Sequence, residues 1–165
     1  MGEFIGTPTG AGVRMALVAS RFNEHVVQKL VDGALECCLK HGATLDAVDV
    51  YWVPGAWELP LALREALQSG RYNASVVVGA VVRGETPHFD FIAGEANRSM
   101  AQLQLEYGVP IGNGLLTTDT MEQAEARAGG AHGNKGWEAA LAALEMADLI
   151  GRLDHSLADE DDGAR

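Results

Sequence analysis

The stretch VVVGAVVRGETPHFDF, residues 76–91, places a long apolar run directly before a polar turn. The run Val76–Val82 is almost wholly apolar and rich in β-branched side chains. Such a continuous pattern is typical of a parallel strand that is covered on both faces. The polar turn after it carries glycine, threonine and histidine. The stretch therefore predicts a buried strand with polar groups at its carboxyl end.

Strands and helices alternate along the chain on both sides of this stretch. Strands are expected at Val13–Ala19, Val48–Val53, Val76–Val82 and Ile111–Thr117, and helices at residues 24–40, Ala56–Gln68, Phe89–Tyr107, 120–128 and Trp137–Leu153. Regular alternation with short connections predicts an α/β protein: a three-layer, doubly wound, four-stranded parallel sheet with helices on both faces.

The residues between these elements indicate where the helices begin and end. Asn23 is expected to cap the first helix, Gly42 to terminate it, and Pro60 to lie in the first turn of the second. Residues 129–136 are expected to form a glycine-rich hinge before the last helix.

Length and composition predict a single domain with two extensions. The chain has 165 residues, of which 47% are hydrophobic, enough for one core of ordinary size. Residues 1–12 are expected to form a flexible arm, residues 13–153 the α/β domain, and residues 154–165 an acidic tail. The tail carries four acidic residues at 159–162 and is expected to be disordered and solvated.

Charge and the length of the apolar runs exclude several classes of partner. The net charge of -11 argues against nucleic acids and anionic membranes as partners, because binding to either needs a basic protein surface. The apolar runs are far shorter than the roughly 20 residues of a membrane helix, and residues 1–12 lack a signal-peptide pattern. The adjacent Cys37 and Cys38 do not suit a disulfide, so a reducing, cytoplasmic location is expected.

Ligands of a doubly wound sheet bind beyond the carboxyl ends of its strands. The site is therefore expected in the loops Ser20–Asn23, Pro54–Glu58 and Arg83–His88. In the first loop, Phe22 is either a stacking surface for a planar ring or a core residue packed under the helix. In the second, Glu58 lies near a helix start, where the helix dipole by itself explains an acidic residue.

The third loop holds the groups most suited to chemistry. The segment Gly84-Glu85-Thr86 precedes a helix, so it is either a small phosphate site made by backbone N–H groups or an ordinary strand–helix turn. His88 is either a polar residue of a turn or an acid/base, because imidazole exchanges protons near neutral pH. Arg127 and Lys135, two cations near glycines, either cap helix carbonyls or bind an anionic ligand.

Several common site motifs are missing from the sequence. The chain has no Walker loop, no GxGxxG dinucleotide fingerprint and no GxSxG nucleophile motif. Its five histidines show no metal-ligand spacing, so no metal site is expected.

Five segments together resemble the lumazine synthase family of riboflavin biosynthesis. They are SRFN at Ser20–Asn23, VPGAWELP at Val53–Pro60, GAVVRGETPHFDF at Gly79–Phe91, GNGLLTTDT at Gly112–Thr120 and RAGGAHGNKG at Arg127–Gly136. Each segment is a weak signal alone, but all five occur in order and the similarity extends from Val13 to Leu149. The resemblance implies a flavodoxin-like form of the predicted sheet.

The resemblance also implies a reaction. The family condenses 5-amino-6-(D-ribitylamino)uracil with 3,4-dihydroxy-2-butanone 4-phosphate to 6,7-dimethyl-8-ribityllumazine, with release of phosphate and water and without a metal or organic cofactor. One alternative is a flavin- or lumazine-binding shell protein without activity, but Thr86, His88, Arg127 and Lys135 favour the enzyme. Another is a flavodoxin-like FMN module, which the absence of a hydroxyl-rich loop after the first strand disfavours.

Individual residues acquire expected roles from the same resemblance. His88 matches the proton-transferring residue; Phe22, Ala56, Trp57, Glu58, Ala80, Val81, Val82, Asn113, Lys135 and Glu138 match substrate-binding positions; Gly84, Glu85, Thr86 and Arg127 match phosphate-binding positions. Among these, Asn113, Arg127, Lys135 and Glu138 match residues that a neighbouring subunit supplies. Asn113 stands where many relatives carry an aromatic side chain, and Glu85 suits a phosphate site only if its carboxylate turns away.

Family members assemble into pentamers, and in many of them twelve pentamers close into an icosahedral shell. The segment between Arg127 and Lys135 lacks the insertion of members that stop at pentamers, which favours the shell. The resemblance thus implies a homo-oligomer with active sites between adjacent subunits, and it makes riboflavin synthase a candidate partner within the shell.

Overall fold

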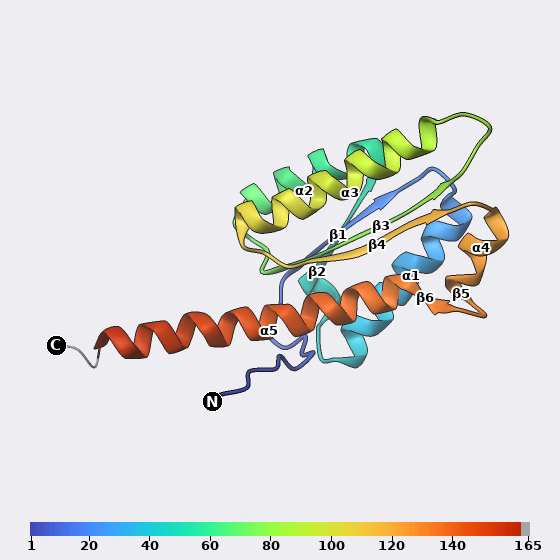
Figure 1. The fold of residues 1–165 in the computed structure, drawn as a ribbon. Coiled ribbons are helices and arrows are strands. Elements are labelled where there is room, and N and C mark those ends of the chain that lie inside the picture. The colour runs from blue at the N-terminus through green and yellow to red at the C-terminus, as the bar shows by residue number, and fades with distance from the viewer. Residues whose placement is uncertain (163–165) are drawn as a thin grey trace.

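The computed structural model describes residues 1–162, with side chains through residue 154. Its centre is a four-stranded sheet in the order β2-β1-β3-β4, in which every neighbouring pair is parallel (Figure 1). The strands are β1 (Met15–Ser20), β2 (Val48–Val53), β3 (Ala74–Val82) and β4 (Ile111–Thr118). The predicted parallel sheet is confirmed, with small differences at the strand ends.

Helices cover both faces of the sheet and complete three layers (Figure 1). On one face lie α1 (Glu24–Lys40) and α5 (Lys135–Asp162), and on the other lie α2 (Leu59–Gln68) and α3 (His88–Tyr107). The short α4 (Met121–Ala126) follows β4, and the 3-10 helices η1 (Leu45–Ala47) and η2 (Ala56–Glu58) precede β2 and α2.

Two apolar cores hold the layers together, one on each face of the sheet. Leu30 of α1 and Leu144 of α5 are fully buried in the first core, and Leu63 of α2 is fully buried in the second. Successive side chains of β3 alternate between them, with Val76 in the first core and Val77 in the second. Because both faces of β3 are covered, an apolar side chain is required at nearly every position of this strand.

The last helix is longer than the sequence indicated. Its backbone is helical to Asp162, whereas an end at Leu153 and a disordered acidic segment were expected. No glycine or proline interrupts residues 152–162, so nothing in the chain stops the helix there. The remainder of the expected tail, residues 163–165, lies outside the described residues. No helix of the described chain is both long and apolar enough to cross a membrane.

The expected glycine-rich hinge is an ordered hairpin. Strands β5 (Ala128–Gly130) and β6 (Gly133–Asn134) pair antiparallel. Gly129 and Gly133 have φ angles of 93° and 77°, a region that other L-residues rarely adopt. The glycines therefore allow a tight reversal of the chain instead of conferring flexibility.

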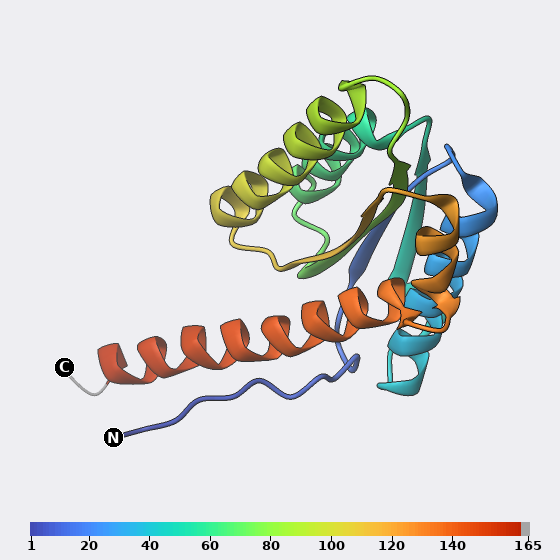
Figure 2. The ribbon, with the colours of Figure 1, turned by 45° about the vertical axis from the view of Figure 1, so that its right-hand side comes forward.

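The N-terminal arm has no helix or strand, yet it is attached to the domain. It runs beside α5 in Figure 2, and the backbone N–H of Thr7 donates to Asp148 Oδ2 at 2.7 Å. Further along, the N–H of Gly10 donates to the carbonyl of His41 at 2.8 Å. These two bonds restrain the part of the arm next to β1, which the sequence predicted to be flexible.

The two cysteines are core residues without a disulfide. Cys37 and Cys38 are buried in α1, and Cys38 Sγ lies 3.5 Å from Met15 Sδ. Burial raises the pKa of Cys37 to about 11 and that of Cys38 to about 12, so both thiols stay protonated at neutral pH. Neither is a nucleophile under those conditions.

Helices α1 and α5 approach each other closely at Gly136, and this contact generates a prediction. A Cβ atom at position 136 would overlap the backbone carbonyl of Leu30, which cannot move away as a side chain could. We expect Gly136→Ala to lower the free energy of unfolding by about 1–3 kcal/mol or more, as overpacking does. Denaturant unfolding at fixed protein concentration measures this change.

Gly94→Ala is the matched control, because a Cβ atom at this exposed position of α3 meets nothing within 4 Å. It should be neutral or stabilise the protein by up to about 1 kcal/mol, the helix propensity difference. Equal stabilities of the two variants would show that the contact at Gly136 is not tight.

Candidate active site

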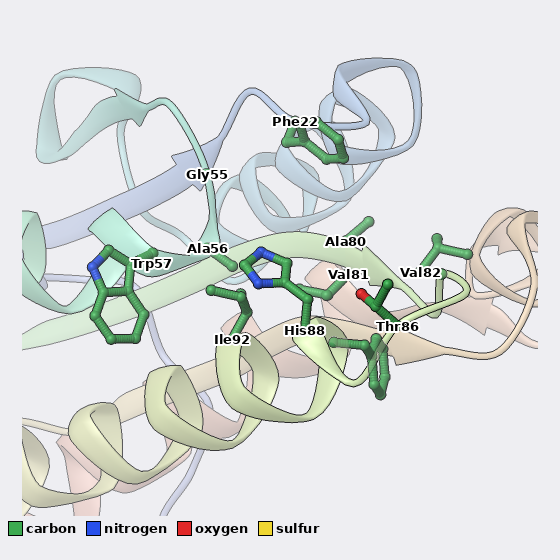
Figure 3. Close-up of a pocket in the computed structure, with 12 residues that line it drawn as sticks. Phe22, Gly55, Ala56, Trp57, Ala80, Val81, Val82, Thr86, His88 and Ile92 are labelled. Atoms are coloured by element: carbon green, nitrogen blue, oxygen red, sulfur yellow. The ribbon is translucent and has the colours of Figure 1, made fainter.

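A pocket of about 370 Å³ lies at the carboxyl ends of β1, β2 and β3 (Figure 3). Its lining residues are Phe22, Gly55, Ala56, Trp57, Ala80, Val81, Val82, Gly84, Thr86, His88, Phe89 and Ile92. They come from the three loops that the strand-end rule selected, together with the end of β3 and the first turns of α3. The walls are mainly apolar, and the polar side chains are those of Thr86 and His88.

Most of the residues expected near the substrates line this pocket. Nine do so: Phe22, Ala56, Trp57, Ala80, Val81, Val82, Gly84, Thr86 and His88. Sequence reasoning missed Gly55, Phe89 and Ile92. The helical spacing offered a signal for Ile92, because residues i and i+4 of a helix share a face and His88 is the first residue of α3.

The first loop projects an aromatic side chain into solvent at the pocket. Phe22 is 71% exposed, so the interpretation of this residue as core is wrong. The loop is tied to its neighbour by two backbone bonds, from Arg21 N to the carbonyl of Val53 at 2.8 Å and from Phe22 N to the carbonyl of Pro54 at 3.1 Å. These bonds set the first and second loops side by side.

Asn23 connects the first loop to the central strand. It occupies the N-cap position of α1, but its side chain does not cap the helix as expected. Its Nδ2 instead donates to the carbonyl of Ala80 at 2.9 Å, and its φ angle is 59°. Asparagine tolerates this left-handed conformation better than most residues. The bond anchors the base of the Phe22 loop to β3 where that strand enters the pocket.

The second loop presents Trp57 and uses Glu58 internally. Trp57 is 59% exposed and lies across the pocket from Phe22 (Figure 3). Glu58 Oε2 accepts from the N–H of Gly55 at 2.9 Å, so this carboxylate helps to shape the turn. Glu58 is not one of the described residues that line the pocket.

The third loop brings His88 and the glycine–threonine segment together. The His88 ring extends from the start of α3 towards Ala56, and Thr86 lies on the loop just before it (Figure 3). A Cβ atom at Gly84 would meet nothing within 4 Å, so this side of the loop is open to a ligand. Gly84 and Thr86 line the pocket, and the exposed Glu85 between them does not.

Similarity to known proteins identifies the family. A model of the 6,7-dimethyl-8-ribityllumazine synthase family matches residues 12–151. The chain is 59% identical to the 6,7-dimethyl-8-ribityllumazine synthase of Gemmatimonas aurantiaca over 92% of this chain and 93% of that protein. It is 49% identical to the synthase of the same name from Chlorobaculum tepidum, over 90% of this chain and 96% of that protein. The chain belongs to this family.

Four residues with roles expected from the lumazine synthase family lie away from the pocket of their own chain. Asn113 Nδ2 donates to Asn97 Oδ1 at 2.7 Å near the start of β4. Arg127 Nη1 donates to the carbonyl of Gln123 at 3.0 Å, and Lys135 Nζ pairs with Glu138 Oε2 at 2.8 Å. Among the described residues, none of these four lines the pocket.

The Asn23 anchor generates a second prediction. Asn23→Ala removes the hydrogen bond to Ala80 and places an alanine in a left-handed conformation. We expect it to lower the free energy of unfolding by about 2–3 kcal/mol in denaturant titrations, from about 1 for the bond and 1–2 for the backbone.

Asn23→Gly separates the two causes, because glycine accepts the left-handed backbone and loses only the bond. It should lower the free energy of unfolding by about 1 kcal/mol. If both variants cost the same, the left-handed conformation of Asn23 is not an energetic constraint.

Proposed function

We infer that this chain is a 6,7-dimethyl-8-ribityllumazine synthase, a transferase that condenses 5-amino-6-(D-ribitylamino)uracil with 3,4-dihydroxy-2-butanone 4-phosphate, the penultimate step of riboflavin biosynthesis. The observation that carries this conclusion is a single pocket in which Phe22, the Gly84–Thr86 loop and His88 meet. It occurs in a chain that is 59% identical to a synthase of that name. No observation favours a binding protein without activity.

The pyrimidine substrate suits the aromatic and apolar part of the pocket. Phe22 offers an exposed ring face on which a flat heterocycle can stack. The strand end Ala80–Val82 supplies an apolar wall, and Trp57 borders the opposite side. We propose that the backbone of the Ala56–Glu58 segment binds the polar edge of the substrate.

The phosphate substrate suits the third loop. Gly84 leaves room for an anion to approach the backbone, and Thr86 adds a hydroxyl donor. The loop leads into the N-terminus of α3, a helix of 20 residues, where unpaired N–H groups and the helix dipole favour negative charge. We propose that the Glu85 backbone takes part while its exposed carboxylate faces solvent.

His88 supplies the proton transfers of the condensation. The 5-amino group attacks the ketone of the four-carbon substrate, and water leaves as the imine forms. A proton then leaves C3 while the C4–O bond breaks, which releases inorganic phosphate and gives an enol. The enol becomes a ketone, the ribitylamino nitrogen attacks it, and a second water leaves as the ring closes. Each step moves a proton, and one general acid/base contributes roughly 10²–10⁴-fold.

We propose that a neighbouring subunit completes the site. Arg127 would hold the phosphate, while Lys135, Glu138 and Asn113 would border the ribityl and carbonyl region. Among the described residues, these four do not line the pocket of their own chain, which supports this arrangement. A pentamer, with twelve pentamers in a shell, is the proposed assembly, and the short hairpin after α4 supports it. Light scattering separates the masses of pentamer and shell.

The same proposal extends to location and partner. The two free, buried thiols support a reducing compartment, and we propose the cytoplasm. Riboflavin synthase, which would consume the product, is the candidate protein enclosed by the shell.

The assignment of His88 generates a third prediction. With both substrates present, the wild-type protein should accelerate formation of the lumazine, followed by product absorbance or fluorescence. His88→Ala should lower kcat by roughly 10²–10⁴-fold with little change in KM, because it removes proton transfer and no binding contact. The assembly should remain intact by light scattering.

His25→Ala is the matched control, because His25 is exposed and lies on α1 outside the residues that line the pocket. It should retain the wild-type rate. No acceleration by the wild-type protein would refute the function, and a wild-type kcat for His88→Ala would refute only the role of this residue.

The shared site generates a fourth prediction. The His88→Ala and Arg127→Ala variants should each be nearly inactive alone. In the proposed site, one subunit supplies His88 and its neighbour supplies Arg127. After the two variants are unfolded together and reassembled at equal amounts, about a quarter of sites should have both residues intact if neighbours mix at random. A recovered rate near that fraction supports the shared site, and no recovery in mixed oligomers contradicts it.

A further inference from the structure

Arg83 lies at the start of the third loop, where both its backbone and its side chain contact other parts of the domain. Its backbone N–H donates to the carbonyl of Thr118 at 2.8 Å, so the residue continues the pairing of β3 with β4. Its Nε donates to Asp119 Oδ1 at 2.9 Å, and its Nη1 lies 3.4 Å from Asp90 Oδ1. The hydrogen bond to Asp119, together with Asp90, raises the pKa of Arg83 above its usual value.

The third partner of this side chain is an aromatic ring of the pocket. The guanidinium carbon lies 4.4 Å from the centre of the Phe89 ring, within the range of a cation–π contact. Phe89 lines the pocket directly after His88. One side chain thus touches both residues that follow His88 in the first turn of α3.

These contacts close the third loop at its base. The loop leaves β3 at Arg83 and enters α3 at His88, and the bond from Arg83 to Asp90 joins its two ends. The loop between them carries Gly84 and Thr86 of the pocket. The partner Asp119 is itself fixed, because its N–H donates to Gln123 Oε1 at 2.9 Å. Strand β4 therefore serves as the support to which the loop is fastened.

We propose that Arg83 is a positioning residue for the condensation: by bridging Asp119 and Asp90 and covering the Phe89 ring, it holds the Gly84–Thr86 loop and the start of α3 in the geometry that receives the phosphate substrate. The proposal deepens the assigned function and rests on it. Planar guanidinium groups suit this task, because their fork of donors engages two acceptors while the face stacks on a ring.

Arg83 has a second effect that the test must separate from positioning. Asp90, Asp119 and Glu85 place negative charge around a loop that would bind an anion. Losing Arg83 leaves two carboxylates unpaired, which would repel the phosphate substrate even in an unmoved loop. A variant that breaks the bridge while it keeps the Arg83 charge distinguishes repulsion from misplacement.

The first variant is Arg83→Met, which keeps an unbranched side chain and removes the guanidinium group. We expect the KM for the phosphate substrate to rise about tenfold or more, as for misplaced binding groups. The KM for the pyrimidine substrate should change far less, because the Phe22 side of the pocket is untouched. Arg98→Met is the matched control: Arg98 also lies in an exposed pair, at 2.7 Å from Glu95 on α3, but outside the pocket. Wild-type values for Arg83→Met would overturn the proposal.

The second variant is Asp119→Ala, which removes the support and leaves the positive charge. Positioning requires that it also raises the KM for the phosphate substrate, and that it adds little to Arg83→Met in the double variant. A lowered or unchanged KM would overturn the positioning role of Arg83. The effect of Arg83→Met would then come from charge repulsion of the phosphate substrate.

A readout independent of turnover is hydrogen–deuterium exchange of residues 83–92 in the assembled protein. Exchange there should quicken in Arg83→Met and Asp119→Ala, and stay at the wild-type rate in Arg98→Met. Unchanged exchange in both variants would overturn the proposal. If the wild-type protein forms no product, the assigned function fails, while the exchange data still decide whether Arg83 holds the loop.

Discussion

Strand β3 has a neighbour on each edge and a helical layer on each face, and this double constraint organises the molecule. Its parallel pairing with β1 and β4 fixes the direction of all three strands, so their carboxyl ends meet at one edge of the sheet. The loops that follow must then lie side by side. The pocket forms where the covering helices start and no longer screen the end of β3, at Ala80–Val82.

The loops are held to that edge by hydrogen bonds that belong to the backbone or end on it. Arg21 donates to the end of β2 and Phe22 to the second loop. Asn23 donates to β3, and Arg83 donates to β4. A pocket with mainly apolar walls can therefore keep its few polar groups in place without a polar core. Under the proposed function, this site would bind and orient the two substrates, and His88 would transfer the protons. Positioning of two reactants can supply roughly 7–11 kcal/mol of the barrier reduction.

Two interpretations of the sequence failed because the partner of a segment is not apparent from that segment alone. Asn23 reads as a helix cap because local statistics favour asparagine there, but the carbonyl of Ala80, distant in sequence, is the acceptor that its side chain meets. The glycines at 129 and 133 read as a hinge because composition does not reveal the partner strand of a hairpin. The hydrogen bonds from Thr7 to Asp148 and from Gly10 to His41 likewise join the arm to residues that are distant in sequence. The deciding partner of Asn23 is distant in sequence, whereas that of the hairpin strand lies only a few residues further along the chain.

The sequence by itself determined the strand and helix order, the parallel sheet and the edge at which the site lies. Those features follow from apolar periodicity and from turn residues, which act within a short stretch of chain. It also carried the segments that mark the family. Only the tertiary structure decided that Phe22 faces the pocket and is not part of the core, that Phe89 lines the pocket, and that Arg83 joins two ends of a loop to β4. The reason is that the exposure and the pairing of a side chain depend on which elements pack against it in the folded domain. A local sequence pattern does not specify that packing.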